Sequence, residues 1–298
     1  MIAAATAATA AGDDGLRTAL VGLFRVVGYL GFVLLVGTMF VLSWLWPERR
    51  PVPMIDRLYD LGVLLVAVSA AAVPVIAFSQ GWASFGGREG ALALARMALA
   101  AVAFAFRQDV LSSARQLRVP ILVWQLLIIE TYVLASDAWG GPWAWVKIIA
   151  TTGHLAATAA WLGGLAVLAV VLVPGTALDV LHAVLPKFSP VAIGSVITLV
   201  VSGVLHALAV AGGVGQLVDS SYGTVLGIKV LVFAVLLLLG NVGRRHTERV
   251  AHRKLENIDG SSSPAGIQAF AVAVGAELAV AACVLATTAV LVHLVPVR

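Results

Sequence analysis

The chain has 298 residues, of which 61% are hydrophobic and 11% are charged, and its mean hydropathy is +1.02. This composition excludes an ordinary soluble domain, and the single cysteine, Cys283, excludes an intramolecular disulfide. The net charge of +4 comes mainly from segments between apolar runs. Because no basic patch is interleaved with aromatic residues, this charge does not indicate nucleic-acid binding.

Eight apolar stretches have lengths that suit membrane-spanning helices, which need about 20 apolar residues. They are predicted at 18–46, 58–80, 91–106, 119–136, 144–173, 188–213, 224–243 and 267–294. The third and fourth are short, and the first and fifth are long enough to tilt or to protrude. The sequence therefore predicts an all-α polytopic membrane bundle of about eight transmembrane helices. Its parts are a short extracytoplasmic tail at 1–17, a four-helix half at 18–143 and a second four-helix half at 144–298.

The basic residues between the predicted spans or at their ends are divided unevenly between the two sides. If the N-terminus is outside, twelve Lys and Arg fall in inner loops and four fall in outer segments. The four outer residues are Arg17, Arg88, Lys147 and Arg298. Since cytoplasmic loops carry an excess of Lys and Arg, both termini are predicted to face outwards. We expect a multi-pass protein of the bacterial cytoplasmic (inner) membrane.

Ionisable residues lie inside several predicted spans, where each costs about 2.5–3.5 kcal/mol near a helix centre. Arg96, Glu130 and Lys229 fall in the outer half of the membrane in this orientation, and Glu277 lies near the middle of the last span. The pattern predicts a polar pocket or transport path near the extracytoplasmic side. Glu277 has Lys229 and Arg96 as candidate partners, and a structural ion pair is an equally good interpretation.

Two stripes of polar residues, one in the fifth span and one in the sixth, each contain a histidine. The stripes are Thr151, His154 and Thr158, and then Thr198, Ser202 and His206. Each set recurs at helical spacing and so shares one helix face. Two neutral imidazoles suffice for low-coordinate Cu(I), which makes His154 and His206 a candidate metal site with Thr158 and Ser202 beside it. Each histidine could instead only hydrogen-bond a neighbouring helix. Gly163-Gly164, further along the fifth span, permits a close helix approach.

Short matches between the halves indicate a four-plus-four duplication. Ser84-Phe85-Gly86 precedes Arg96 as Ser221-Tyr222-Gly223 precedes Lys229, and RVVGYLG from Arg25 is matched by KIIATTG from Lys147. Because four helices per half is an even number, the repeats would be parallel and related by an axis along the membrane normal.

Four segments in order resemble the CopD family of copper-resistance membrane proteins. They are HLAATAAWLGGL, KFSPVAIGSVITLVVSGVLHAL, SYGTVLGIKVLVFAVLLLLGNVGRR and AELAVAACVLATTAVLVHLVP. The resemblance is close over about 147–296 and looser over 18–136. It implies an eight-helix inner-membrane protein that handles copper. The residues that it points to are His154, Trp161, Tyr222, Lys229 and Glu277.

The expected function is copper ion transport or delivery across the cytoplasmic membrane from the extracytoplasmic side. The expected partners are the lipid bilayer and an extracytoplasmic copper carrier. The alternatives are a non-transporting accessory or assembly subunit of a membrane complex, such as a respiratory oxidase, and a haem-binding electron carrier with His154 and His206 as axial ligands. With no nucleophile elbow, zinc-protease signature or phosphate-binding loop, we expect no enzymatic activity, no catalytic residue and no cofactor site besides copper.

Overall fold

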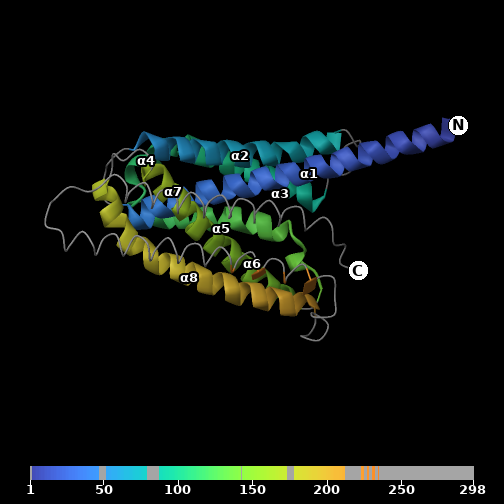
Figure 1. The fold of residues 1–298 in the computed structure, drawn as a ribbon. Coiled ribbons are helices and arrows are strands. Elements are labelled where there is room, and N and C mark those ends of the chain that lie inside the picture. Colours follow the sequence, from blue (N-terminus) through green and yellow to red (C-terminus); the bar gives the residue numbers. More distant parts are fainter. Residues whose placement is uncertain are drawn as a thin grey trace, which may run out of the picture.

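The computed structural model describes residues 2–46, 52–78, 87–141, 143–172 and 178–211, with six isolated positions between 223 and 234. Every regular element in these ranges is a helix, and the helices lie side by side along one direction (Figure 1). The helices are α1 Ile2–Phe40, η1 Val41–Leu45, α2 Pro53–Phe78, α3 Arg88–Ala105, α4 Arg107–Ser113, α5 Arg118–Leu134, η2 Asp137–Trp139, α6 Ala144–Thr158, η3 Ala159–Gly163, α7 Gly164–Leu172 and α8 Leu178–Ala211. The segments η1 and η3 are single π-helical turns that continue α1 and α6.

The prediction of a helical membrane bundle is confirmed in the described part of the chain. Four helices there are long and apolar enough to cross a bilayer, at Ala19–Leu45, Pro53–Val75, Ala144–Val170 and Ala183–Ala211. A fifth span results if α3 and α4, which are bent by 59° to each other, count as one. α5 has 17 residues, about 25 Å of helix, at the short end of what a span needs. The total of eight spans stays a prediction, because 224–243 and 267–294 lie almost wholly outside the described residues.

α8 begins earlier than the sequence predicts, at Leu178 rather than near 188. Pro186 and Pro190 lie inside it, and prolines normally mark a helix boundary because they lack an N–H. In a membrane the backbone has no water to bond, so the helix is the form that satisfies most of its polar groups, and prolines are tolerated there.

α1 and the π-helical turn η3 touch backbone to backbone at two glycines, Gly37 and Gly163. A Cβ atom at Gly163 would lie 2.5 Å from the Cα of Gly37 and 2.5 Å from the carbonyl oxygen of Val33. Conversely, a Cβ atom at Gly37 would lie 2.6 Å from the carbonyl oxygen of Ala159. Only glycine at both positions allows this approach, which is how small residues let membrane helices pack.

The next residue, Gly164, performs the same role towards α8. A Cβ atom here would lie 3.0 Å from the Cζ of Phe188 and would overlap other atoms of its ring. The predicted close approach at Gly163-Gly164 is therefore confirmed: the first glycine contacts α1 and the second accommodates a ring from α8.

α1 and α2 form an antiparallel pair that also depends on glycine. A Cβ atom at Gly31 of α1 would lie 2.7 Å from the backbone nitrogen of Val66, and one at Gly62 of α2 would lie 2.7 Å from that of Leu35. α1 thus presents one face to α2 and, six residues after Gly31, another face to η3.

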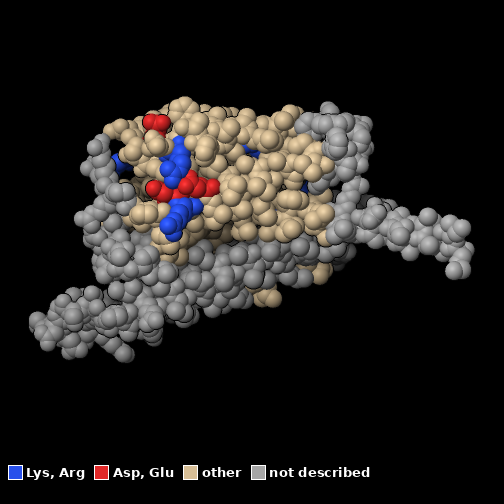
Figure 2. Space-filling view, turned by 90° about the horizontal axis from the view of Figure 1, so that it is seen from above, with Lys and Arg blue, Asp and Glu red and all other residues tan. Residues whose placement is uncertain are grey.

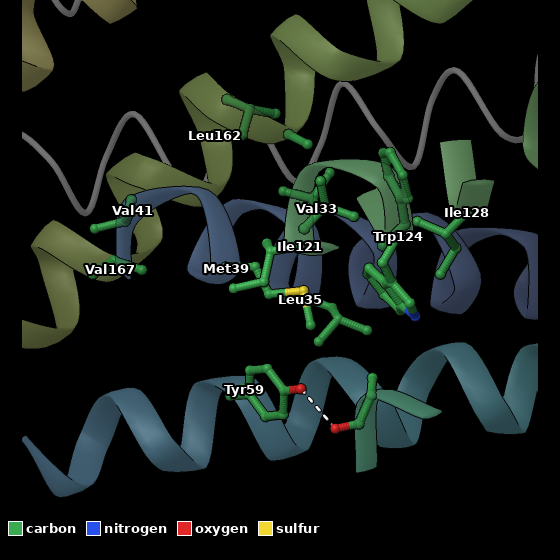
Figure 3. Packing of buried hydrophobic residues seen from close by; sticks show 14 of the residues in the cluster. Val33, Leu35, Met39, Val41, Tyr59, Ile121, Trp124, Ile128, Leu162 and Val167 are labelled. Carbon is green, nitrogen blue, oxygen red and sulfur yellow. Dashed lines mark hydrogen bonds between the residues drawn. The ribbon is translucent and has the colours of Figure 1, made fainter. Parts of the chain in front are cut away.

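The core lies between α1, α2, α5 and α7 (Figure 3). Leu35, Ile128 and Val167 are fully buried there. Three polar side chains in this core donate to backbone carbonyls of neighbouring helices: Tyr59 Oη to Ala103 at 2.8 Å, Trp124 Nε1 to Leu99 at 3.1 Å and Gln125 Nε2 to Val36 at 2.9 Å. Such bonds satisfy donors that would be expensive to leave unpaired in an apolar interior.

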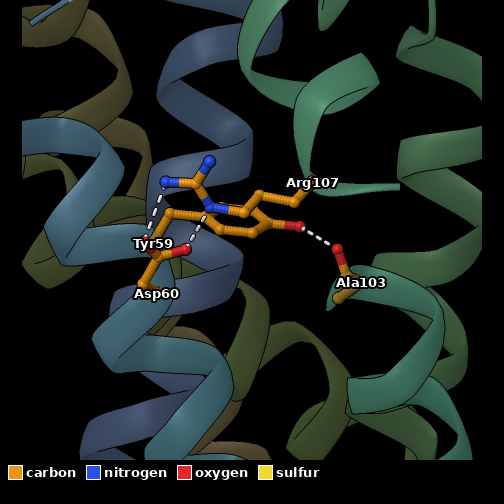
Figure 4. A network of polar contacts seen from close by, with 4 residues as sticks. All are labelled: Tyr59, Asp60, Ala103 and Arg107. Carbon is orange, nitrogen blue, oxygen red and sulfur yellow. Dashed lines mark hydrogen bonds and ion pairs between the residues drawn. The ribbon is translucent and has the colours of Figure 1, made fainter. Parts of the chain in front are cut away.

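Charged groups gather towards the end of the bundle where α4 lies. There Arg107, the first residue of α4, forms an ion pair with Asp60 of α2, in which Nη2 lies 2.8 Å from Oδ2. The residue before Asp60, Tyr59, donates a hydrogen bond to the carbonyl oxygen of Ala103 in the last turn of α3 (Figure 4). Consecutive residues of α2 therefore hold both sides of the bend between α3 and α4. On the face that Figure 2 presents, Lys, Arg, Asp and Glu gather mainly near this end, and most of the other described surface on that face is uncharged.

The glycine contact generates the first prediction. Gly37→Ala should lower the free energy of unfolding by about 1–3 kcal/mol, the usual cost of forcing extra atoms into a packed core. Gly194→Ala on α8 is the matched control, because a Cβ atom there meets nothing within 4 Å; it should be neutral or slightly stabilising, since alanine favours a helix over glycine. Denaturation of the purified variants in detergent measures both, and equal stability of the two variants would contradict the packing described.

Thr38 generates the second prediction. Its side chain is 0% exposed, and its hydroxyl has no hydrogen-bond partner in the described structure. A buried unpaired hydroxyl costs about 1–3 kcal/mol, so Thr38→Val, which keeps the shape, should leave stability unchanged or raise it. The same denaturation assay tests this. A clear loss of stability would mean that the hydroxyl has a partner in the membrane.

Candidate functional site

His154 of α6 and His206 of α8 both lie on the interface between these antiparallel helices, and each bonds a hydroxyl of the other helix. His154 Nδ1 is 3.0 Å from Ser202 Oγ, and His206 Nδ1 is 3.2 Å from Thr151 Oγ1. Each helix therefore contributes one imidazole and one hydroxyl. His154 stands three residues after Thr151, about 4.5 Å along the helix axis, so the histidines occupy adjacent turns of one interface.

The burial pattern of α8 explains why Ser202 and His206 face α6. Ser195, Leu199 and Ser202 are buried, and His206 is half-buried; these positions recur every three or four residues, as one face of a helix does. Ile193, Ile197 and Val204 on the other side are 53%, 58% and 53% exposed. The exposed side is mainly apolar, as suits a lipid-facing surface, and its exposed Thr198 bonds the backbone of its own helix, whereas Ser195 and Ser202 are buried.

Ser202 is placed to orient the ring of His154. Ser202 Oγ is 3.0 Å from His154 Nδ1 and 3.2 Å from the carbonyl oxygen of Leu199. In the tautomer with a proton on Nδ1, His154 donates to Ser202 while Ser202 donates its single proton to Leu199. Metal-binding histidines commonly show this arrangement, in which one nitrogen donates to a protein oxygen and the other binds the metal.

A carboxylate extends this cluster to α5. Thr152 Oγ1 donates to Glu130 Oε1 at 2.7 Å, and Thr152 follows directly after Thr151, which bonds His206. Two consecutive threonines of α6 thus reach opposite neighbours, one on α5 and one on α8. Together Glu130, Thr152, Thr151, His206, Ser202 and His154 form what we call the histidine cluster.

Arg96 belongs to a different group of residues on the other side of α5. Its Nε and Nη2 atoms donate to Thr131, at 3.2 Å to Oγ1 and 2.7 Å to the carbonyl oxygen, and its guanidinium lies 4.4 Å from the ring centroid of Tyr132. Consecutive residues of α5 therefore point different ways: Glu130 towards α6, and Thr131 and Tyr132 towards α3 and α1. The single polar pocket predicted from the sequence is divided by α5 into two clusters.

Residues 182–291 match the family model described as Copper resistance protein D. This segment is less than half of the chain; it is similar to that family of copper-resistance proteins and contains Ser202 and His206. The long apolar helices of the described part indicate a membrane protein. No curated protein and no solved structure matches the chain.

The other predicted site residues have different outcomes. Thr158 donates to the carbonyl oxygen of His154 at 2.8 Å, and Thr198 donates to that of Gly194 at 2.8 Å, so both hydroxyls bond their own helices. The predicted residues Tyr222, Lys229 and Glu277 lie outside the described residues, and their roles stay predictions. Within the described ranges, no three or more His, Cys, Asp or Glu side chains gather in a metal-binding group.

Sequence reasoning missed Thr152 and did not show that Lys147 is buried. Thr152 stands beside the predicted stripe and faces another helix, so helical spacing alone gave no signal for it. Lys147 was counted as an outer-loop charge, but it is 8% exposed and its amine donates to the carbonyl oxygen of Gly140. The cause is the turn before α6, where Gly141 and Trp143 have φ of 75° and 64° and bring the loop back over the first turn of the helix.

The histidine cluster generates a prediction about coupling across the interface. His154→Ala and Ser202→Ala should not be additive in stability: we expect a coupling energy of about 0.5–1.5 kcal/mol, the usual worth of one hydrogen bond. Thr198→Ala is the matched control on the same helix, and it should combine additively with His154→Ala because its hydroxyl bonds Gly194. A double-mutant cycle from denaturation curves measures both. Additive effects for Ser202 as well would show that the two residues do not interact.

Proposed function

We propose that this CopD-like protein transports or delivers copper across the cytoplasmic membrane from the extracytoplasmic side, with His154 and His206 as its binding pair. The observation that supports this most is the reciprocal bonding of each histidine to a hydroxyl of the facing helix. It holds two imidazoles on adjacent turns of one interface within a chain similar to a copper-resistance family.

Copper is the substrate in this proposal, and the donor set fits it. Imidazole is a good copper ligand, and two such ligands suffice for Cu(I). In the tautomer in which Nδ1 of His154 donates to Ser202, Nε2 is the atom that would bind the ion. A substrate must leave as well as enter, so a site of two neutral nitrogens suits transport better than a closed set of charged ligands would.

Glu130 adds a negative charge to the cluster. It reaches the histidine-bearing helix through Thr152, whereas Arg96 is directed away to the other face of α5. A carboxylate on the side of the histidines and a guanidinium on the opposite side favour a cation at the histidine cluster. Charge complementarity of this kind raises the local concentration of a charged substrate.

The location of the cluster supports entry from the extracytoplasmic side. Glu130 lies near the end of α5, His206 near the end of α8, and Arg107 and Asp60 lie at the opposite end of the bundle. The distribution of Lys and Arg predicts that the end with Arg107 is cytoplasmic. The histidine cluster would then lie in the outer half of the membrane.

Copper titration tests this proposal. The full chain, purified in detergent, would be titrated with Cu(I) against a competing chelator, and bound metal would be measured by elemental analysis. We expect about one copper per chain, lost in His154→Ala and in His206→Ala. Ser202→Ala should weaken binding about 10–100-fold, as loss of a partner that orients a metal-binding histidine does, and Thr198→Ala should not change it.

Two outcomes would contradict the proposal. One is folded protein that binds only trace copper in every variant; a partner that copurifies with it would then favour the accessory-subunit interpretation. The other is copper binding that both histidine variants retain. Copper accumulation by cells or by proteoliposomes containing the wild type, but not His206→Ala, would extend the result from binding to transport.

A further inference from the structure

The second polar cluster, on the α1 and α3 side of α5, is centred on Tyr132. Tyr132 Oη donates to the carbonyl oxygen of Gly28 at 3.1 Å, and its ring lies 5.5 Å from that of Tyr29 and 5.0 Å from that of Phe32. The guanidinium of Arg96 covers the same ring at 4.4 Å. The cluster thus joins α1, α3 and α5, and it contains neither histidine nor cysteine.

Arg96 has donors that the described structure does not use. A guanidinium carries five N–H groups, and those of Arg96 make two hydrogen bonds, both to Thr131. No carboxylate in the described part of the chain forms an ion pair with it. Thr131 and Tyr132 therefore fix the plane of a cationic group, and three of its N–H groups remain for another acceptor.

A second arginine lies close by. Arg25 stands four residues before Tyr29 on α1, so the two share a helix face, and Tyr29 contacts Tyr132 beneath Arg96. Arg25 and Arg96 are within electrostatic range of each other and of Tyr29. Arg25 is exposed and makes no hydrogen bond with the described residues. Glu89, at the start of α3, acts on Arg96 electrostatically and forms no ion pair with it.

Two cations on neighbouring helices repel each other in an apolar medium, and a guanidinium such as that of Arg96 is expensive to bury without a counter-charge. The fixed guanidinium fork of arginine matches the paired oxygens of phosphate and carboxylate groups. From this juxtaposition we propose that Arg25 and Arg96, with Tyr29, bind a phosphate-type oxyanion between α1 and α3. The phosphate is that of a lipid headgroup or a free ion.

Both a lipid headgroup and a free phosphate ion can reach this site. Arg25 is exposed and Arg96 is half-buried, so an anion can reach both from the surface of the bundle while Tyr29 and Tyr132 form its apolar floor. The proposal is independent of copper binding, because the histidine cluster lies across α5 and shares no residue with this one.

The test measures binding of matched probes to the full chain, stripped of lipid in a neutral detergent. Phosphatidylglycerol is compared with diacylglycerol of the same acyl chains, which lacks the phosphate, by native mass spectrometry. Inorganic phosphate is titrated separately at constant ionic strength. The variant is Arg25→Gln, which removes no hydrogen bond of the described structure. The matched control is Arg88→Gln, an exposed arginine of α3 whose guanidinium stacks on Trp139 at 4.8 Å.

We expect phosphatidylglycerol, inorganic phosphate or both to bind the wild type, and diacylglycerol not to. Arg25→Gln should weaken this binding at least about tenfold, since a charge-assisted bond contributes about 1.5–3 kcal/mol, and Arg88→Gln should not. Binding of phosphatidylglycerol alone identifies a lipid as the source, and binding of both probes identifies the oxyanion itself. The proposal is overturned if neither probe binds, or if Arg25→Gln and Arg88→Gln have equal effects. Copper stoichiometry should be the same in all three proteins.

Discussion

The contact between Gly37 and Gly163 is the constraint on which the rest of the described structure depends. It brings α1 and η3 together at backbone distance, and because α1 also packs on α2 through Gly31, it ties the first pair of helices to the chain that carries His154. The contact has a symmetric form. A side chain at either glycine would meet the carbonyl group four residues before the other, at Val33 or Ala159. A parallel two-fold repeat, as the sequence predicts, would produce such a contact, and the repeat itself stays a prediction.

α5 determines how the polar residues are used. Glu130, Thr131 and Tyr132 are consecutive, and the rotation of about 100° between neighbours on a helix sends the carboxylate towards α6 and the other two towards α3 and α1. In the described residues the carboxyl group of Glu130 and the guanidinium of Arg96 therefore lie on different sides of one short helix, rather than bonding to each other. Because unpaired charges are expensive inside a membrane, each side is a candidate for a ligand of the opposite charge.

Much of this architecture could be predicted from the sequence, and the reasons for the rest are physical. Apolar runs locate helices because the bilayer fixes their length, and helical spacing correctly placed Ser202 and His206 on one face. Spacing does not show which hydroxyls bond the backbone of their own helix. Thr158 was therefore grouped with His154, and Thr198 with His206, although both hydroxyls bond carbonyl groups of their own helices. Helical spacing also does not show which neighbouring helix a charged side chain faces in the packed bundle. Arg96 and Glu130 therefore seemed to share one pocket, although α5 separates them.

The central claim is that copper binds between His154 and His206, and X-ray absorption spectroscopy of the Cu(I)-loaded full chain tests it most directly. The account predicts a two-coordinate copper with nitrogen ligands, and outer-shell scattering from two imidazole rings. His206→Ala should remove this signature, since it takes away one ring of the pair. Sulfur ligands in the spectrum, which only Cys283 and the four methionines of the chain could supply, would contradict the account and place the copper elsewhere.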